Sequence, residues 1–317
     1  MSGARVKAGG RLIVILGPTS SGKSALAISL AERLAGEVLV CDSTQVYRHF
    51  DIGTGKVPVA EQRGIPHHLV DLVESHEVFT AGEYRKRALD ALDQVGRRGK
   101  LPIITAGTGL YLRALLEGLA DAPERSEQLR DRLRKKAELG GPEHLHRVLA
   151  RMDKEAADKI APRDAPKIIR AIEIRTLAGK PVGEIHRSGR KRLEGYSISK
   201  LGLQPERHAL YARINARVEA MIASGWIEEV RGLVARGVPG DAKPFQFIGY
   251  SDLRTCLKPG AGTKHDAVKR IQQSTRQFAK RQITWFRKEP DVTWLPGFGD
   301  DPEILAAAVG LAQASDG

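Results

Sequence analysis

Cysteines, aromatic residues and long apolar runs are all scarce in this chain of 317 residues. Its two cysteines, Cys41 and Cys256, are far apart and form no CxxC pair, so we expect buried, reduced thiols rather than a disulfide framework or a zinc knuckle. No apolar run approaches the roughly 20 residues that a membrane-spanning helix needs, which argues against a membrane partner. Residues 1–10 lack the apolar segment of a secretory signal, and we therefore expect a cytoplasmic protein.

Acidic residues are also in deficit. The chain has 51 Lys and Arg against 38 Asp and Glu, which gives a formal net charge of +13. A charge of this size attracts polyanions, so nucleic acid is a candidate partner. The sequence has no NKxD motif, which argues against the common guanine-specific GTPases.

Short apolar runs alternate with helix-forming stretches in the first part of the chain. Residues 25–34 are rich in helix formers, and a capping box from Thr80 to Glu83 predicts a second helix that reaches about Val95. Alternation of strands and helices is typical of a parallel, doubly wound sheet. The predicted strands are residues 12–16, 38–41, 101–105 and 196–203.

The composition changes near residue 123, where charged residues cluster and strand-like runs almost disappear. We predict a helical insertion over residues 123–196, between core segments 1–122 and 197–317. In the second core segment we expect two helices followed by a long basic helix, and we expect the tail to pack loosely. These elements are residues 210–223, 226–236, 265–288 and 304–312, in that order.

Residues 17–24 match the motif GxxxxGK[ST] in full, between an apolar strand and a helix. Such a loop turns backbone N–H groups toward phosphate oxygens, and the following helix directs its positive end at them. The predicted phosphate ligands are Gly17, Pro18, Thr19, Ser20, Ser21, Gly22, Lys23 and Ser24, and Ser24 is also the predicted Mg²⁺ ligand. The motif predicts phosphate binding but not nucleotide hydrolysis, because any diphosphate satisfies the same groups.

Asp42 follows the apolar run 38–41, and its role is open on the sequence alone. In a nucleotide-hydrolysing enzyme this carboxylate would serve the metal. In a second interpretation it faces an acceptor and takes its proton, while Gln45 hydrogen-bonds a base edge. In a third, it is a buried Asp that only caps the end of the strand.

The motifs, taken in their order along the chain, resemble those of the tRNA dimethylallyltransferase family of isopentenyl-diphosphate-type transferases. The similar segments are the phosphate loop and residues 42–48, 51–56, 64–71, 107–111, 170–174, 249–250 and 276–287. The resemblance implies an α/β fold, in which a P-loop NTPase-like core with a parallel sheet carries a mainly helical, tRNA-binding insertion. Ala106, Lys167 and Ser251 depart from the family pattern, and Ser251 removes a cation from a loop expected to face RNA.

This resemblance implies transfer of the dimethylallyl group of dimethylallyl diphosphate to the exocyclic N6 amine of the adenosine 3′ of the tRNA anticodon, with release of diphosphate. It implies that Asp42 accepts the proton, that Thr19 donates to the bridging oxygen, and that Lys23 and Mg²⁺ stabilise the leaving group. Arg217, one turn from Arg213 on a predicted helix, is a further candidate ligand of diphosphate. We expect a monomer.

The predicted tRNA-binding residues come from the end of the second strand, the insertion and the C-terminal part of the core. They are Asp42, Ser43, Thr44, Gln45, Thr108, Arg130, Lys167, Arg170, Gly249, Tyr250, Arg276, Lys280 and Arg281.

Three rival functions stay open at this point. A P-loop nucleoside or metabolite kinase would keep Lys23, Ser24 and Asp42 but would need an arginine-rich lid. A non-catalytic RNA-binding protein would use a nucleotide as a switch. A transferase acting on free AMP shares the chemistry, and the predicted insertion and basic helix favour tRNA over AMP.

Overall fold

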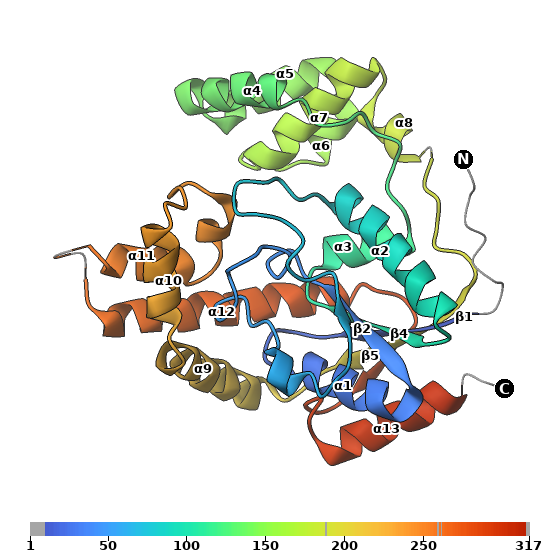
Figure 1. The fold of residues 1–317 in the computed structure, drawn as a ribbon. Coiled ribbons are helices and arrows are strands. Elements are labelled where there is room, and N and C mark those ends of the chain that lie inside the picture. The colour runs from blue at the N-terminus through green and yellow to red at the C-terminus, as the bar shows by residue number, and fades with distance from the viewer. Residues whose placement is uncertain (1–9, 188, 259, 261, 315–317) are drawn as a thin grey trace. The chain divides into compact units, whose positions relative to one another are not determined.

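The computed structural model describes residues 10–187, 189–258, 260 and 262–314 of the chain (Figure 1). They form two compact units, of which one contains the residues up to 115 and from 194 onward, and the other contains residues 116–193. The first unit contains a parallel sheet with helices, and the second is helical. The fold class predicted from the sequence is confirmed.

Six parallel strands form one sheet in the order β3-β2-β4-β1-β5-β6. They are β1 (Gly10–Leu16), β2 (Gly36–Cys41), β3 (His67–His68), β4 (Leu101–Ala106), β5 (Tyr196–Leu203) and β6 (Val292–Leu295). β1 occupies an inner position because residues 12–16 are all apolar and are buried on both faces of the sheet. The edge strands β3 and β6 are too short to be recognised in the sequence.

Helices cover both faces of this sheet (Figure 1). The helices of the first unit are α1 (Lys23–Leu34), α2 (Ala81–Arg97), α3 (Gly109–Leu116), α9 (Arg207–Ala223), α10 (Trp226–Ala235), α11 (Tyr250–Cys256), α12 (Lys264–Phe286) and α13 (Pro302–Ala314), with short 3₁₀ turns at Val59–Glu61 and Lys243–Gln246. α1 and α13 pack on one face, and α2 and α3 lie on the other (Figure 1). The apolar residues of the strands that face α1 and α13 form the main core with them.

Local signals in the sequence explain where two of the longest helices begin. The Thr80 hydroxyl accepts a hydrogen bond from the N–H of Glu83 at the start of α2, as the capping box predicts. At the start of α12 the Thr263 hydroxyl accepts from the N–H of Asp266 in the same way. Both caps satisfy backbone donors that the helix itself leaves unpaired.

Two expectations about packing are wrong. The tail does not pack loosely: it forms α13, which buries Ile304, Ala308 and Ala312 in the core beside α1. A helix with alanine on its inner face can approach its neighbour closely, and this is why the Ala-rich composition gives tight packing. Cys41 is buried as expected, but Cys256 is only partly buried, at the end of α11.

The second unit consists of α4 (Glu127–Gly140), α5 (Pro142–Met152), α6 (Lys154–Asp158), α7 (Ala165–Ala178) and α8 (Val182–Arg187). Its core is apolar, with Leu145, Leu149 and Ile168 buried at its centre. A fully buried carboxylate, that of Glu173 on α7, interrupts this core. Arg130 and Arg170 both donate to it, so the buried charge is paired.

No helix in the described part of the chain is both long and apolar enough to cross a membrane. The N-terminal stretch 1–10, from which the cytoplasmic location is predicted, lies outside the described residues except for Gly10.

Candidate active site

The candidate site lies at the carboxyl ends of β1, β2 and β4, the edge at which open parallel sheets bind ligands. The phosphate loop follows β1, Asp42 follows β2, and Gly107 follows β4. A cavity of about 800 Å³ is lined by these loops and by residues of α9 and α12. All of the lining residues belong to the first unit.

The phosphate loop depends on glycine at the start of α1. Gly22 has a φ of +88°, a left-handed conformation that glycine adopts without strain. A Cβ atom at this position would also lie only 2.6 Å from the backbone nitrogen of Gly299. Nearby, the hydroxyls of Ser20 and Ser21 are buried without a hydrogen-bond partner among the described residues. The loop therefore offers unsatisfied polar groups beside the positive end of α1, as an anion site requires.

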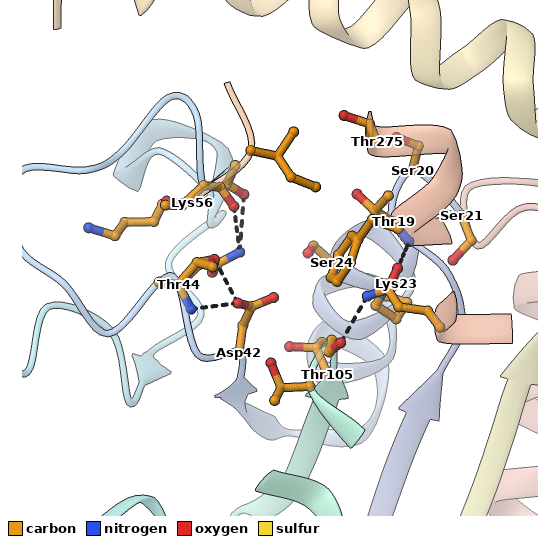
Figure 2. A pocket seen from close by; sticks show the side chains of 18 of the residues that line it. Thr19, Ser20, Ser21, Lys23, Ser24, Asp42, Thr44, Lys56, Thr105 and Thr275 are labelled. Carbon is orange, nitrogen blue, oxygen red and sulfur yellow. Dashed lines mark hydrogen bonds between the residues drawn. The ribbon is translucent and has the colours of Figure 1, made fainter. Parts of the chain in front are cut away.

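Lys23 is the first residue of α1, and its ammonium donates hydrogen bonds to the carbonyl oxygens of Gly17 (2.9 Å) and Pro18 (2.8 Å). Burial lowers the pKa of Lys23 from 10.5 to about 8; the charge of Asp42 opposes this change, and that of Arg217 adds to it. Figure 2 shows Lys23 and Asp42 reaching the same space from α1 and β2. Phosphate oxygens are charged acceptors and bind an ammonium more strongly than carbonyl oxygens do.

Arg217 is a second cation in the cavity wall, and no described residue pairs with its guanidinium. It lies on α9, where burial and the neighbouring charge of Arg213 lower its pKa. Arg213, one turn earlier, is engaged: it donates two hydrogen bonds to Asp300, of 2.8 and 2.9 Å. Of the two arginines considered from the sequence, the structure therefore leaves Arg217 available to an anion in the cavity.

Asp42 is oriented by its neighbours. Its Oδ1 accepts from both the N–H (2.8 Å) and the hydroxyl (2.7 Å) of Thr44, as dashed lines mark in Figure 2. No described residue donates a hydrogen bond to its Oδ2. A Cβ atom at Gly107 would lie 2.3 Å from Oδ2, so glycine at this position leaves room for the carboxylate. One oxygen is thus fixed and the other is left for a ligand.

The residues after Asp42 hydrogen-bond within the protein. The Thr108 hydroxyl accepts from the N–H of Ser43 (2.9 Å), which ties the end of β2 to the end of β4. The side-chain amide of Gln45 donates to the carbonyl oxygens of Thr54 (3.2 Å) and Gly55 (3.4 Å). Both contacts shape the cavity wall, and the predicted contacts of Ser43, Thr44, Gln45 and Thr108 with a nucleotide stay predictions.

Gln282 was not recognised as a site residue from the sequence. It is buried on α12, and its Oε1 accepts from the backbone N–H of Thr19 (2.7 Å) while its Nε2 donates to the carbonyl oxygen of Gly107 (2.8 Å). A glutamine between the basic residues of a helix gives no sign of burial. The available signal was its position three residues before Trp285, on the face of α12 that also carries the buried Phe286.

The rest of the cavity wall is largely apolar. Ile214, Val218 and Met221 line it from the face of α9 that also carries Arg217. Val57, Phe247, Ile248, Phe278 and Trp285 complete this lining. The cavity thus combines cations at one part of its wall with hydrocarbon at another, which suits an amphiphilic ligand with an anionic head.

Gly249 and Tyr250, both predicted to contact tRNA, are buried. The Tyr250 hydroxyl donates to Glu229 (2.7 Å), and its ring packs against Phe50 and Trp226. Glu229 also accepts from the N–H groups of residues 51 and 52, so this cluster holds the 51–56 segment. The structure gives Tyr250 a packing role, and its contact with tRNA stays a prediction.

In the second unit the structure separates the predicted tRNA ligands into two groups. Arg130 and Arg170 donate to the buried Glu173, so they also hold the unit together. Burial alone would raise the pKa of Glu173, but hydrogen bonds from Arg170, from the N–H of Ser126 and from Arg130 lower it. Lys167 is exposed and pairs only with Asp164, the N-cap of its own helix.

The three predicted ligands on α12 also differ. Arg276 is half-buried and donates to the side chain of Asn215 (2.6 Å). Lys280 and Arg281 are exposed, and Arg281 lies on the cavity wall with its guanidinium over the ring of Phe278. Of these three predicted ligands, Lys280 and Arg281 are therefore the ones that an external polyanion can reach.

The donor set in the cavity fits Mg²⁺ held mainly by a substrate. No cluster of three or more His, Cys, Asp or Glu side chains that could hold a metal occurs in the described part of the chain. Ser24 follows Lys23 in α1 and belongs to the lining of the cavity, as Asp42 does (Figure 2). Mg²⁺ prefers oxygen ligands and typically takes few from the protein, with phosphates and waters supplying the others.

Comparison with known proteins gives one consistent result. The family model described as IPP transferase matches residues 45–289. The chain is 50% identical to the tRNA dimethylallyltransferase of Koribacter versatilis over 305 residues, and the matched region covers 96% of this chain and 98% of that protein. Its fold is similar to the crystal structure of a tRNA isopentenylpyrophosphate transferase from Bacillus halodurans, with 35% identity, a TM-score of 0.69 and coverage of 96% of this chain and 98% of that chain. It is also similar to a eukaryotic dimethylallyltransferase acting on tRNA, with 28% identity, a TM-score of 0.82 and coverage of 97% and 80%. The chain therefore belongs to the IPP transferase family, as the order of its sequence motifs implied.

Proposed function

We infer that this chain is a tRNA dimethylallyltransferase. It transfers the dimethylallyl group of dimethylallyl diphosphate to the exocyclic N6 amine of the adenosine 3′ of the tRNA anticodon and releases diphosphate. The observation that carries this inference is that two cations, Lys23 and Arg217, share one cavity with the carboxylate of Asp42 and with an apolar wall. Each part of the cavity matches one part of the reaction.

The phosphate loop holds the diphosphate of the donor. Its backbone N–H groups, the Lys23 ammonium and the Arg217 guanidinium surround the leaving group, where negative charge grows as the C–O bond breaks. The Thr19 hydroxyl is the candidate donor to the bridging oxygen. The prenyl chain lies on the apolar residues of α9, which are Ile214, Val218 and Met221. Ser24 is the residue that would hold Mg²⁺, and this ion would supply positive charge to the leaving group when bound.

Asp42 takes the proton of the attacking amine. The nitrogen of adenosine forms a bond to the first carbon of the dimethylallyl group, and the electron pair of the C–O bond leaves with the diphosphate. The amine then carries a proton to lose, and the Oδ2 of Asp42 is the oxygen left unpaired by Thr44. Because Thr44 fixes Oδ1, the carboxylate keeps its orientation while it works.

The polyanionic substrate is drawn by the net charge of +13. The exposed Lys280 and Arg281 extend the cationic surface outward from the cavity, and the second unit adds the exposed Arg132, Lys135 and Lys136. A nucleotide reaches the cavity only after it leaves the stack of its loop, which costs a few kcal/mol at most in a single-stranded loop. We propose that the enzyme acts in the cytoplasm, as a monomer.

The experiment that tests the function supplies labelled dimethylallyl diphosphate with unmodified tRNA, with AMP or with neither. We expect label in tRNA alone. Lys23→Ala is expected to abolish transfer, and Lys200→Ala serves as the matched control, since Lys200 is a partly exposed lysine of β5 whose ammonium donates to the carbonyl of Pro290. Label in AMP would favour the free-nucleotide transferase. Consumption of ATP with phosphorylation of a small acceptor, and no use of the prenyl donor, would favour the kinase.

A further inference from the structure

The geometry points to Gln282 as a positioning residue that sets the distance between the phosphate loop and Asp42. This inference deepens the proposed function and rests on it. It concerns a buried side chain of the cavity lining whose two hydrogen bonds join the phosphate loop to the loop beside Asp42.

The first step is the pair of hydrogen bonds. Gln282 accepts from the N–H of Thr19 (2.7 Å), the third residue of the phosphate loop, and donates to the carbonyl oxygen of Gly107 (2.8 Å). A carboxamide is the one common side chain that presents an acceptor and a donor side by side in a plane. Among the described residues it is the side chain that joins these two loops directly.

The second step is what each loop carries. Thr19 belongs to the loop whose N–H groups face the leaving diphosphate. Gly107 belongs to the loop that packs against Asp42. Its N–H donates to the carbonyl oxygen of Cys41, and a Cβ atom added to it would clash with the Asp42 carboxylate. The two hydrogen bonds of Gln282 therefore connect the leaving-group side of the cavity to its proton-accepting side.

The third step is the location of Gln282 on α12. The side chain is buried, while the adjacent Lys280 and Arg281 are exposed cations of the same helix turn. The amide therefore links the turn of α12 that carries these two cations to both loops. Both partners of Gln282 are backbone atoms, of Thr19 and Gly107. The connection between the two loops therefore depends on the side chain of Gln282 and not on those of its partners.

The test compares Gln282→Met, which keeps the length of the side chain and removes both hydrogen bonds, with Gln282→Glu. An ionised Glu accepts from Thr19 but cannot donate to Gly107, whereas a protonated Glu can do both. Gln272→Met is the matched control, since Gln272 lies on α12 and bonds α9 through Asn215 and Glu219, away from the phosphate loop.

We expect Gln282→Met to lower kcat for transfer by roughly 10²-fold, the scale of a misplaced reacting group, with a smaller change in KM for the donor. The activity of Gln282→Glu, divided by that of the wild type at each pH, is expected to rise as the pH falls from 8 to 6. Gln272→Met is expected to keep kcat. Equal losses of kcat in the two Met variants, or a Gln282→Glu ratio that does not change with pH, would reduce Gln282 to a packing residue.

Binding of inorganic diphosphate, measured by calorimetry, separates this inference from the proposed function. If the wild type binds diphosphate and Gln282→Met binds it more weakly, Gln282 shapes the phosphate loop whatever the acceptor is. If the wild type transfers dimethylallyl groups and Gln282→Met does so equally well, the function stands and the positioning role is refuted.

Discussion

The pKa of Lys23 predicts how donor binding depends on pH. In the protein without donor, burial lowers this pKa to about 8. Only the protonated ammonium attracts a diphosphate, and a bound diphosphate raises the pKa again. Raising the pH through 8 therefore removes the charge from the free enzyme and weakens binding.

The size of the effect follows from the titration of one group. With a pKa of about 8, about nine-tenths of the enzyme carries the ammonium at pH 7 and about one-tenth at pH 9, so Kd should rise about tenfold between these values. The second ionisation of a phosphate ester lies near about pH 6, so the donor keeps its charge over this range. Calorimetric titration with dimethylallyl diphosphate at constant ionic strength measures this change.

Two variants decide whether Lys23 is the titrating group. Lys23→Arg carries a guanidinium that stays charged, so its Kd should be flat from pH 7 to 9 even if it is weaker throughout. Arg217→Met removes the neighbouring cation that lowers the pKa of Lys23, so the midpoint should move to higher pH. A wild-type Kd that does not change with pH, or a Lys23→Arg profile that rises like the wild type, would refute this assignment.

Three further predictions follow from particular contacts. Asp42→Asn should lower kcat by about 10²-fold or more with little change in donor Kd, and a loss of Mg²⁺ affinity alone would make Asp42 a metal ligand instead. Glu173→Gln should destabilise the second unit by about 3–5 kcal/mol in thermal or urea unfolding, because it leaves Arg130 and Arg170 without their carboxylate. The pKa of Glu173 is lowered in the folded protein, so in the wild type this stabilisation should be lost as the pH falls through that pKa. An unchanged unfolding midpoint in the variant would mean that the two arginines find other partners. Lys280→Ala with Arg281→Ala should weaken tRNA binding and reduce the slope of log K against log[salt] by about 0.7 to 0.9 for each lost phosphate contact, without changing donor Kd, whereas equal losses for donor and tRNA would assign this part of α12 to the core.

Much of the fold could be predicted because its signals are local. The strands 12–16, 38–41 and 101–105 are mainly apolar runs and 196–203 is a β-like stretch, and each corresponds to a strand within one or two residues of its ends. The cap at Thr80 and the phosphate loop are also local patterns. The role of α13 could not be predicted, because its packing depends on α1, which lies nearly 280 residues earlier in the chain.

The same limit applies to the candidate site. The phosphate loop and Asp42 each follow a recognisable strand, so their meeting at one edge of the sheet follows from parallel topology. Gln282, by contrast, acts through backbone atoms of residues 19 and 107, and nothing near it in the sequence indicates those partners. Tyr250 shows a different limit, since the motif similarity gave no sign that the residue is buried and hydrogen-bonded to Glu229, and its contact with tRNA stays a prediction.

The pairing of the cations separates binding groups from structural ones. Arg213, Arg130, Arg170 and Arg98 each meet a carboxylate, and these pairs hold elements together. Lys23 and Arg217 are instead held close to each other, with Asp42 as the nearest opposing charge and no direct ion pair in the described residues. Burial disfavours the charged form of both groups, and the charge of Arg217 lowers the pKa of Lys23 further, so these charges are unfavourable in the protein without its donor. An anionic diphosphate offsets this cost when it binds, so the unfavourable charge of the free site becomes affinity for the one part of the donor that must leave.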